Sequence, residues 1–262
     1  EAGDGSGSWD DDVDMFGIKP VLKVSDMITL TPYVHWIYSS DARDFQANTK
    51  ELNLWYLGID ADFKLDMASV WFTGIWNGGN VDDLSGTSSD RAGYLLAVGA
   101  NGAVGPVGLH GQAFYASGDD DLADGDDDAF SVPSWGGQSY YWSEIMGLGL
   151  FDNRASNASP GNKISNIWAI NLGVSYTLVE GLKLKGDYWY AQLAEDNIAG
   201  NSDLGSELVA TATYKIMDNL NLDLVAAYLF AGDATESGNP NADPPTSDDD
   251  PYEIGARISL SF

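Results

Sequence analysis

Apolar and polar side chains alternate with a period of two along most of this chain. From Trp168 to Tyr176 every second residue is large and apolar, and the residues between are small or polar. The same period runs through 208–216 and 252–262. Because successive side chains of a β-strand point to opposite faces, this period predicts strands with one apolar and one polar face. The sequence therefore indicates an all-β fold.

Eleven segments show this alternation. They span residues 16–24, 27–39, 51–65, 68–77, 91–102, 106–117, 164–178, 182–195, 205–216, 220–232 and 252–262. Tight turns alternate with long acidic loops, expected at 40–50, 78–90, 118–163, 196–204 and 233–251. Tight turns at one end and long loops at the other are typical of a transmembrane β-barrel, and strands of about ten residues suit a tilted crossing. We expect a single domain, 1–262, forming a transmembrane antiparallel up-and-down β-barrel, with long loops extracellular and short turns periplasmic.

A soluble β-sandwich also alternates and is the competing fold. The segments here exceed the usual strand length of about five or six residues. Aromatic residues also gather near the ends of the apolar faces, as in the girdles of membrane barrels. They are Trp36, Tyr38, Trp55, Trp76, Tyr94, Trp168, Tyr188, Tyr190, Tyr228, Phe230 and Tyr252. Length and aromatic placement both favour the barrel.

The composition excludes several function classes. The 12 basic and 40 acidic residues give a net charge of −28, which leaves no case for binding nucleic acid. The chain has no cysteine, so it has no disulfide and no thiolate site. It opens on a polar, acidic stretch without the features of a signal peptide. The only histidines, His35 and His110, fall on the polar faces of separate segments; we find no catalytic set and expect no enzyme.

Several stretches resemble known outer-membrane proteins. The ending YEIGARISLSF (252–262) resembles the C-terminal signature of bacterial outer-membrane barrels. The stretches 54–79, 140–153 and 208–234 resemble porin-like, alginate-export-type barrels of Gram-negative sulfate- and metal-reducing bacteria. The resemblance covers most of 50–262 and implies an outer-membrane location among lipid and lipopolysaccharide. It implies that Phe262 is the signal read by the barrel-insertion machinery. It carries over no substrate-binding residue and leaves a homo-oligomer open.

The charged residues divide between a lumen wall and the loops. Alternation places the following on the polar, lumen-facing side of the strands: Lys19, Lys23, Lys64, Lys183, Lys185, Lys215, Arg257, Asp60, Asp62, Asp187, Glu207, Asp223 and Glu253. This wall is near neutral, so the acidity lies in the loops. We expect a passive, weakly cation-preferring diffusion channel for small hydrophilic solutes and ions. Two alternatives stay open: a channel for an acidic polysaccharide, which needs a continuous basic track, and a plugged structural or anchor barrel.

The acidic loop 118–163 carries the densest carboxylate cluster. It comprises Asp119, Asp120, Asp121, Asp124, Asp126, Asp127 and Asp128. The favoured interpretation is a solvated loop. The alternative is a weak Ca²⁺ site, since Ca²⁺ takes six to eight oxygen ligands. The spacing does not fit an EF-hand, and we expect no other cofactor.

The second half of the same loop is aromatic and apolar. A loop beyond about 15 residues without structure of its own is usually functional or disordered. We expect this half to fold into the lumen as a constriction, with Trp135, Tyr140, Tyr141, Trp142 and Glu144 as its residues. An aromatic cap packed outside the barrel is the alternative.

Strand parity makes a separate prediction. Segments 16–24 and 252–262 both run from the long-loop end to the short-turn end. Single-chain bacterial barrels have an even number of strands, which eleven does not satisfy. We expect residues 1–15 to be the remnant of an external loop and the eleven strands to be the C-terminal part of a larger, even-stranded barrel.

Overall fold

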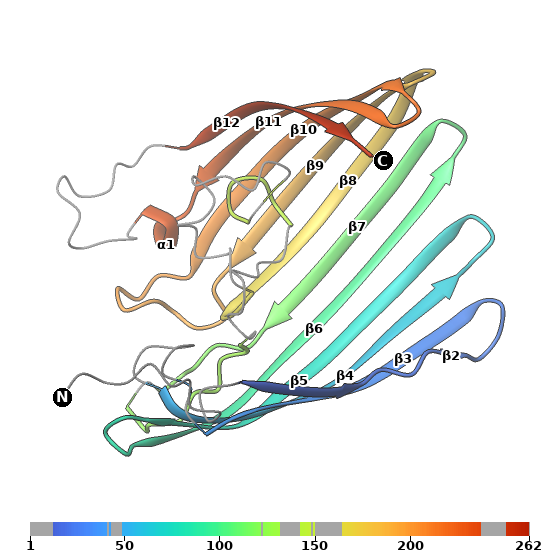
Figure 1. The fold of residues 1–262 in the computed structure, drawn as a ribbon. Coiled ribbons are helices and arrows are strands. Elements are labelled where there is room, and N and C mark those ends of the chain that lie inside the picture. The colour runs from blue at the N-terminus through green and yellow to red at the C-terminus, as the bar shows by residue number, and fades with distance from the viewer. Residues whose placement is uncertain are drawn as a thin grey trace, which may run out of the picture.

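The computed structural model contains one large antiparallel sheet (Figure 1). It describes residues 13–40, 42, 49–121, 123–131, 142–147, 149, 164–236 and 250–261. The strands are β1 (Asp14–Ile18), β2 (Leu22–Lys23), β3 (Ile28–Ser39), β4 (Thr49–Lys64), β5 (Ala68–Asp83), β6 (Ser88–Val104), β7 (Val107–Ala116), β8 (Ile167–Val179), β9 (Leu182–Gln192), β10 (Asp203–Met217), β11 (Leu220–Ala231) and β12 (Tyr252–Leu260). A single helical turn, α1 (Asp233–Glu236), follows β11. No helix in the described part of the chain is long and apolar enough to cross a membrane.

The sheet is a simple meander. Its order is β1-β3-β4-β5-β6-β7-β8-β9-β10-β11-β12, with β2 also paired to β3, and all of its ladders are antiparallel. Each pair from β3 onward is therefore formed by consecutive strands. The predicted all-β, up-and-down fold is confirmed. Short turns gather at one end of the sheet, and the longer connections and α1 lie at the other (Figure 1).

Two expected boundaries were wrong. The segment 16–24 is not one strand, because Lys19, Pro20 and Val21 separate β1 from β2; proline has no N–H to donate to a ladder. The loop expected at 78–90 is mostly strand, since β5 and β6 continue to a short turn after Asp83.

The turn between β5 and β6 is organised by Asp83. Its carboxylate accepts hydrogen bonds from the Ser85 hydroxyl at 2.6 Å and from the backbone N–H groups of Ser85 and Thr87 at 2.8 and 2.9 Å. These hydrogen bonds lower the pKa of the Asp83 carboxyl, and the bond from the Ser85 hydroxyl has the largest effect. Gly86 supplies a positive φ of 88°, which glycine adopts without strain. The turn therefore keeps β5 and β6 paired as far as Asp82 and Ser88.

The outer face of the sheet is apolar and bears an aromatic girdle toward the long-loop end. Trp36 stacks between Phe16 and Trp55, with ring centroids 5.6 and 5.4 Å away. Further along the sheet, Tyr94 stacks on Tyr115 at 5.6 Å. The alternation places Leu, Val, Ile and aromatic side chains on this face, and many of them are exposed. Exposed apolar side chains below an aromatic belt are the lipid-facing surface of a membrane barrel.

The inner face is polar toward the short turns and apolar toward the long loops. Its buried cluster comprises Phe114, Ala116, Phe130, Trp142, Met146, Ile164, Ile167, Ala169, Trp189, Ala191, Leu204, Leu229 and Ala234. Most of these residues belong to β7–β11, and the others come from the connections that fold over those strands. A hydrophobic core thus sits inside the curve of the sheet, at its long-loop end.

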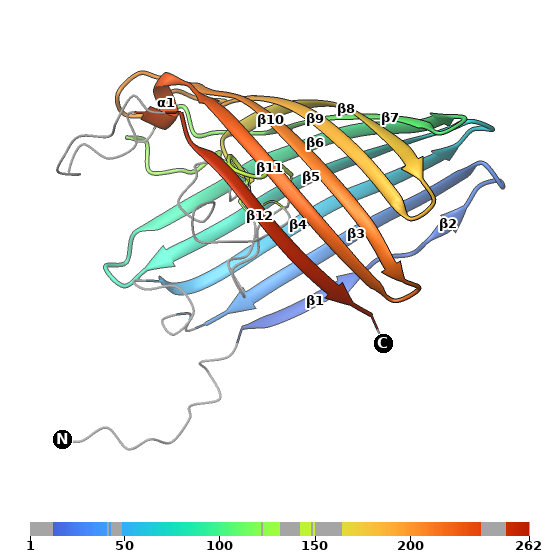
Figure 2. The ribbon, with the colours of Figure 1, turned by 90° about the horizontal axis from the view of Figure 1, so that it is seen from above.

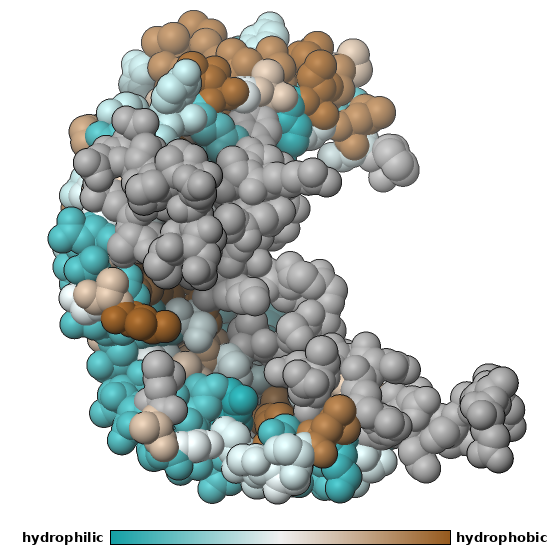
Figure 3. Space-filling view, turned by 90° about the vertical axis from the view of Figure 1, so that its left-hand side faces the viewer, coloured by the Kyte–Doolittle hydropathy of each residue, from teal (hydrophilic) through white to brown (hydrophobic). Residues whose placement is uncertain are grey.

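The sheet curls but does not close. Figure 2 shows it curving from β1 round to β12, and Figure 3 shows a C-shaped wall with one open side. No ladder joins β1 to β12 within the residues that the structure describes. A direct parallel pairing of these two edge strands, which would close the sheet on itself, is therefore not formed. The predicted larger barrel, with further strands between the two edges, stays a prediction.

Candidate functional site

A buried carboxylate on the inner face of β10 holds a short segment of the long loop. The side chain of Glu207 is 0% exposed. Its two oxygens accept hydrogen bonds from the backbone N–H groups of Glu144, Ile145 and Met146 at 2.8, 3.0 and 2.9 Å, and from the Ser143 hydroxyl. Successive N–H groups arranged in this way form a concave nest that suits an anion. Glu207 therefore fixes the segment 142–147 against the wall.

Aromatic packing reinforces this attachment. The Trp142 ring lies edge-on to Phe114 at 5.3 Å and to Trp189 at 5.1 Å between centroids. Phe114 and Trp189 are inner-face residues of β7 and β9, and Met146 joins the same cluster, 2% exposed. Burying these side chains removes apolar surface from water at roughly 25 cal/mol per Å². Segment 142–147 consequently lies inside the curve of the sheet.

Two of the residues predicted for a constriction can be placed in the structure. Trp142 and Glu144 both belong to segment 142–147, and both are buried. Trp135, Tyr140 and Tyr141 lie outside the described residues, as does Phe262, the predicted insertion signal. The role of segment 142–147 as a constriction of a pore stays a prediction.

The first half of the long loop is also attached to the inner face. Phe130, 1% exposed, packs over β6 at Gly93, where a Cβ would lie 2.5 Å from the Cα of Phe130. Glycine is therefore required for this close approach. The Arg91 guanidinium pairs with Asp127, and the backbone N–H of Asp127 donates to the Asp90 carbonyl at 2.8 Å. Residues 126–130 thus lie along β6.

The aspartates of this loop bond mainly to its own backbone. Asp119, Asp121 and Asp124 each accept a hydrogen bond from the N–H two residues on, at 3.2, 3.1 and 2.8 Å. Within the described ranges, no three acidic or histidine side chains gather closely enough to hold a metal ion. The Ca²⁺ site over Asp119–Asp128 stays a prediction.

Ion pairs lie on the lumen wall near both of its edges. Lys19 Nζ lies 3.0 Å from Asp60 Oδ2, and the Thr73 hydroxyl donates to Asp60 Oδ1 at 2.8 Å. Near the other edge, Arg257 Nη2 lies 3.6 Å from Asp223 Oδ2. Each pair brings a predicted wall cation beside a predicted wall carboxylate. The charges neutralise each other locally.

The middle of the wall holds a polar cluster centred on Asp187. His110 Nε2 lies 2.6 Å from Asp187 Oδ1, and Lys185 Nζ lies 2.8 Å from Asp187 Oδ2. The Asn171 side-chain amide donates to Asp187 Oδ1 at 3.2 Å. Gly173 makes room for this arrangement, since a Cβ there would collide with the His110 ring. The cluster joins β7, β8 and β9, three strands that share no local sequence motif.

The other wall lysines lie near the short turns. Lys215 Nζ lies 2.9 Å from Asp218 in the turn after β10; this hydrogen bond lowers the pKa of the Asp218 carboxyl. Lys23, Lys64 and Lys183 are exposed and make no ion pair with the residues that the structure places. The two remaining wall acids lie on the same face, at Asp62 and Glu253.

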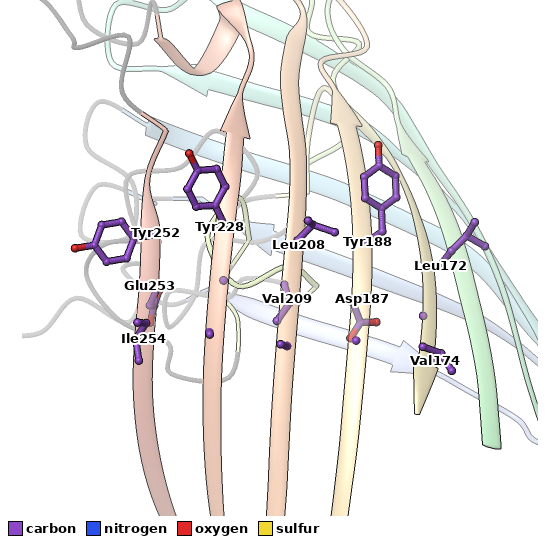
Figure 4. A pocket seen from close by; sticks show the side chains of 15 residues that line it. Leu172, Val174, Asp187, Tyr188, Leu208, Val209, Tyr228, Tyr252, Glu253 and Ile254 are labelled. Carbon is purple, nitrogen blue, oxygen red and sulfur yellow. The ribbon is translucent and has the colours of Figure 1, made fainter. Parts of the chain in front are cut away.

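The outer face carries an apolar hollow of about 890 Å³ (Figure 4). Its floor is a row of small residues paired in register: Gly186, Ala210 and Ala226. Leu172 and Tyr252 border it on either side, and the rings of Tyr188 and Tyr228 rise above it. The hollow is part of the lipid-facing surface.

Sequence reasoning placed Glu207 on the wall but missed its partners. They lie 61 to 64 residues away in the chain. Nothing near Glu207 in sequence distinguishes it from the other wall acids, because the nest that binds it is made of backbone groups. The His110–Asp187 pair spans 77 residues and was missed for the same reason.

Comparison with solved structures identifies the class of fold. No protein-family model matches the sequence, and no curated protein matches it. OccK5 (OpdH) of Pseudomonas aeruginosa matches with a TM-score of 0.50 and 13% identity over 95% of this chain and 58% of that one. The siderophore receptor PirA of P. aeruginosa matches with a TM-score of 0.50 and 9% identity, over 87% and 35%. The NanC porin matches at 0.41 and 9%, over 97% and 95%.

These likenesses concern the fold. This chain spans just over half the length of OccK5 and about a third of PirA. With its polar inner face, apolar outer face and aromatic girdle, the chain has the fold of outer-membrane β-barrels.

Proposed function

We propose that this chain forms the wall of a channel in the bacterial outer membrane, through which small hydrophilic solutes and ions diffuse. The observation that carries the proposal is the division between the two faces of the curled sheet. The concave face presents Asp, Lys, His, Asn and Thr side chains over its short-turn half, and the convex face is apolar. A polar interior within a lipid-facing wall suits a water-filled lumen.

The segment 142–147 is proposed as the constriction of this channel. Glu207 and the aromatic cluster of Phe114, Trp142 and Trp189 attach it to the inner face at the long-loop end. A segment attached there occupies space that solutes would otherwise cross. Loops that enter the lumen set the width of the passage, whereas side chains on the wall tune its selectivity.

We propose a weak preference for cations. Four of the seven wall cations lie in ion pairs, and the acidic cluster 119–128 lies at the long-loop mouth. Exposed carboxylates attract cations over about 8 Å at physiological ionic strength, and the attraction weakens as salt rises. The preference is therefore expected to be modest and to fade with salt.

The acidic-polysaccharide channel and the plugged anchor barrel are the two alternatives to this proposal. An acidic-polysaccharide channel needs a continuous basic track along the lumen, but Lys185, Lys215 and Arg257, which would have to form part of it, each lie beside a carboxylate, which interrupts the track. A plugged anchor barrel is favoured by the apolar core inside the sheet, which also contains Phe130 and Met146. The plugged barrel is thus the second candidate.

Conductance across a planar lipid bilayer tests the proposal. We expect the purified protein, inserted as a closed barrel, to give discrete current steps, with a reversal potential in a salt gradient that indicates cation preference at 0.1 M KCl and little preference at 1 M. A strong preference for anions at low salt would instead support the polysaccharide channel. An inserted barrel that passes no current would support the plugged barrel.

A further inference from the structure

A second feature of the inner face lies at the opposite end from the constriction. A hollow of about 790 Å³ opens beside the short turns that follow β4 and β6. Lys64 of β4 and Lys183 of β9 both border it. Between them, the lining carries neutral hydrogen-bonding groups: Ser69, Asn101, Ser175 and Thr177. Lys64 and Lys183 thus border the same hollow from strands that β5 to β8 separate, and the lining also contains apolar residues, among them Leu65, Met67 and Leu109.

These two lysines differ from the other cations around them. Lys185 is paired with Asp187 at 2.8 Å and Lys215 with Asp218 at 2.9 Å. Lys64 and Lys183 make no ion pair with any residue in the described ranges. The nearby turns do carry acids, Asp66 and Glu180, but both are exposed and neither borders the hollow. Lys64 and Lys183 therefore border the hollow without an ion-pair partner among the described residues, and Asp62, two residues before Lys64, lies on the same face.

The neutral groups are also arranged to donate hydrogen bonds. The Ser69 hydroxyl donates to Asn101 Oδ1 at 3.0 Å, which leaves the Asn101 side-chain N–H groups available to a ligand. His110 borders the same hollow, and its Nε2 is held 2.6 Å from Asp187. Ammonium, amide and hydroxyl donors around one hollow match an oxyanion, whose oxygens accept several hydrogen bonds at once.

We propose that this hollow binds a small multivalent oxyanion, such as a phosphate, a sulfate or a polycarboxylate, at the short-turn mouth. Lys64 and Lys183 supply the charge, and Asn101, Ser175 and Thr177 supply neutral donors. With this site, the two ends of the molecule carry charge of opposite sign, because the long-loop end carries the acidic cluster 119–128. It deepens the proposed channel by naming the solute class for which this mouth has affinity.

Equilibrium binding of pyrophosphate tests the site without requiring a current. The full chain in detergent at low ionic strength is titrated by calorimetry, alongside the double variant Lys64→Gln/Lys183→Gln. The matched control is Lys23→Gln, an exposed wall lysine near a short turn that does not border the hollow. We expect the double variant to bind about tenfold more weakly, because both positive charges that border the hollow are lost and their attraction for the anion is partly screened. The dissociation constant of the control variant for pyrophosphate should stay within about twofold of that of the original protein.

Two results would overturn the site: no binding by the original protein, or equal binding by the double variant. Equal losses in the double variant and in Lys23→Gln would also overturn it, since they indicate diffuse attraction to positive charge. Conductance in KCl without pyrophosphate separates this inference from the proposed function. If the protein binds pyrophosphate but passes no current, the oxyanion site is supported and the channel is contradicted. If the protein conducts but does not bind pyrophosphate, the channel is supported and the site is contradicted.

Discussion

Glu207 illustrates how one side chain can position a distant segment. It is fully buried, yet four donors from residues 143–146 surround its carboxylate. A buried charge is tolerated only when it is paired or hydrogen-bonded, and the nest meets that condition. The donors depend on Glu207 in turn, because without it their polar groups would be buried unpaired.

Replacing Glu207 should release the segment that it holds. In Glu207→Ala, three backbone N–H groups and the Ser143 hydroxyl lose their acceptor, and we expect a loss of about 3 kcal/mol in stability. We also expect a larger single-channel conductance, since segment 142–147 no longer stays on the wall. Urea unfolding in detergent and bilayer recording measure the two effects.

The matched control for this variant is Ser206→Ala, the preceding residue, whose side chain contacts Tyr188 on the outer face. It should leave conductance unchanged. An unaltered conductance in correctly inserted Glu207→Ala would contradict the assignment of segment 142–147 as the constriction.

At the scale of single strands, the two-residue period decides which side chains face lipid. On β8, Leu172 and Val174 are exposed on the outer face, and Asn171 and Gly173 lie on the inner face. Because neighbouring strands pair in register, the inner and outer faces stay distinct across the whole sheet. Shifting the register by one residue would exchange the faces.

Introducing a charge on adjacent residues of β8 tests this division. We expect Val174→Lys to destabilise the inserted protein by about 2–4 kcal/mol, because its ammonium would lie in hydrocarbon. Ser175→Lys, one residue further along β8, should lower the free energy of unfolding much less. It should also shift the reversal potential in the direction of anion preference. Unfolding free energies in lipid vesicles compare the two, and equal costs would contradict the assignment of the faces.

The sequence predicted the strands well and their ends less well. Alternation located the strands from β3 to β12, because the membrane leaves each one an apolar and a polar side, but it merged β1 and β2 into one segment. It did not predict the extension of β5 to Asp83, because the stretch from Asn77 onward is polar and glycine-rich, without an apolar face. That extension continues past Trp76 of the girdle, where the outer face no longer needs apolar side chains and alternation carries no signal. The contacts of Glu207 and Asp187 depend on tertiary packing and have no local signature.

At the scale of the whole molecule, the open side of the sheet requires partners. Unpaired backbone groups cost several kcal/mol each in hydrocarbon, so bare edges at β1 and β12 are not viable there. Both strands run toward the short-turn end. An antiparallel closure therefore needs an odd number of further strands between them.

Disulfide cross-linking tests this closure in a chain that has no cysteine of its own. We expect Ile18→Cys and Ile254→Cys, on β1 and β12, to form no intramolecular disulfide in the membrane. The control pair, Ala226→Cys and Ile254→Cys, faces each other in register on β11 and β12 and should cross-link, since bridged Cα atoms lie about 4.4–6.8 Å apart. Efficient linkage of β1 to β12 would show that the sheet closes on itself.

The most direct test of a water-filled lumen is the accessibility of single cysteines along one strand during conduction. Thr211 and Thr213 lie on the inner face of β10, and Ala210 and Ala212 lie on the outer face. With a charged, membrane-impermeant thiol reagent, we expect the current to fall stepwise for cysteines at 211 and 213 and to stay constant for cysteines at 210 and 212. Block at the outer positions, or no difference between the two sets, would contradict the channel.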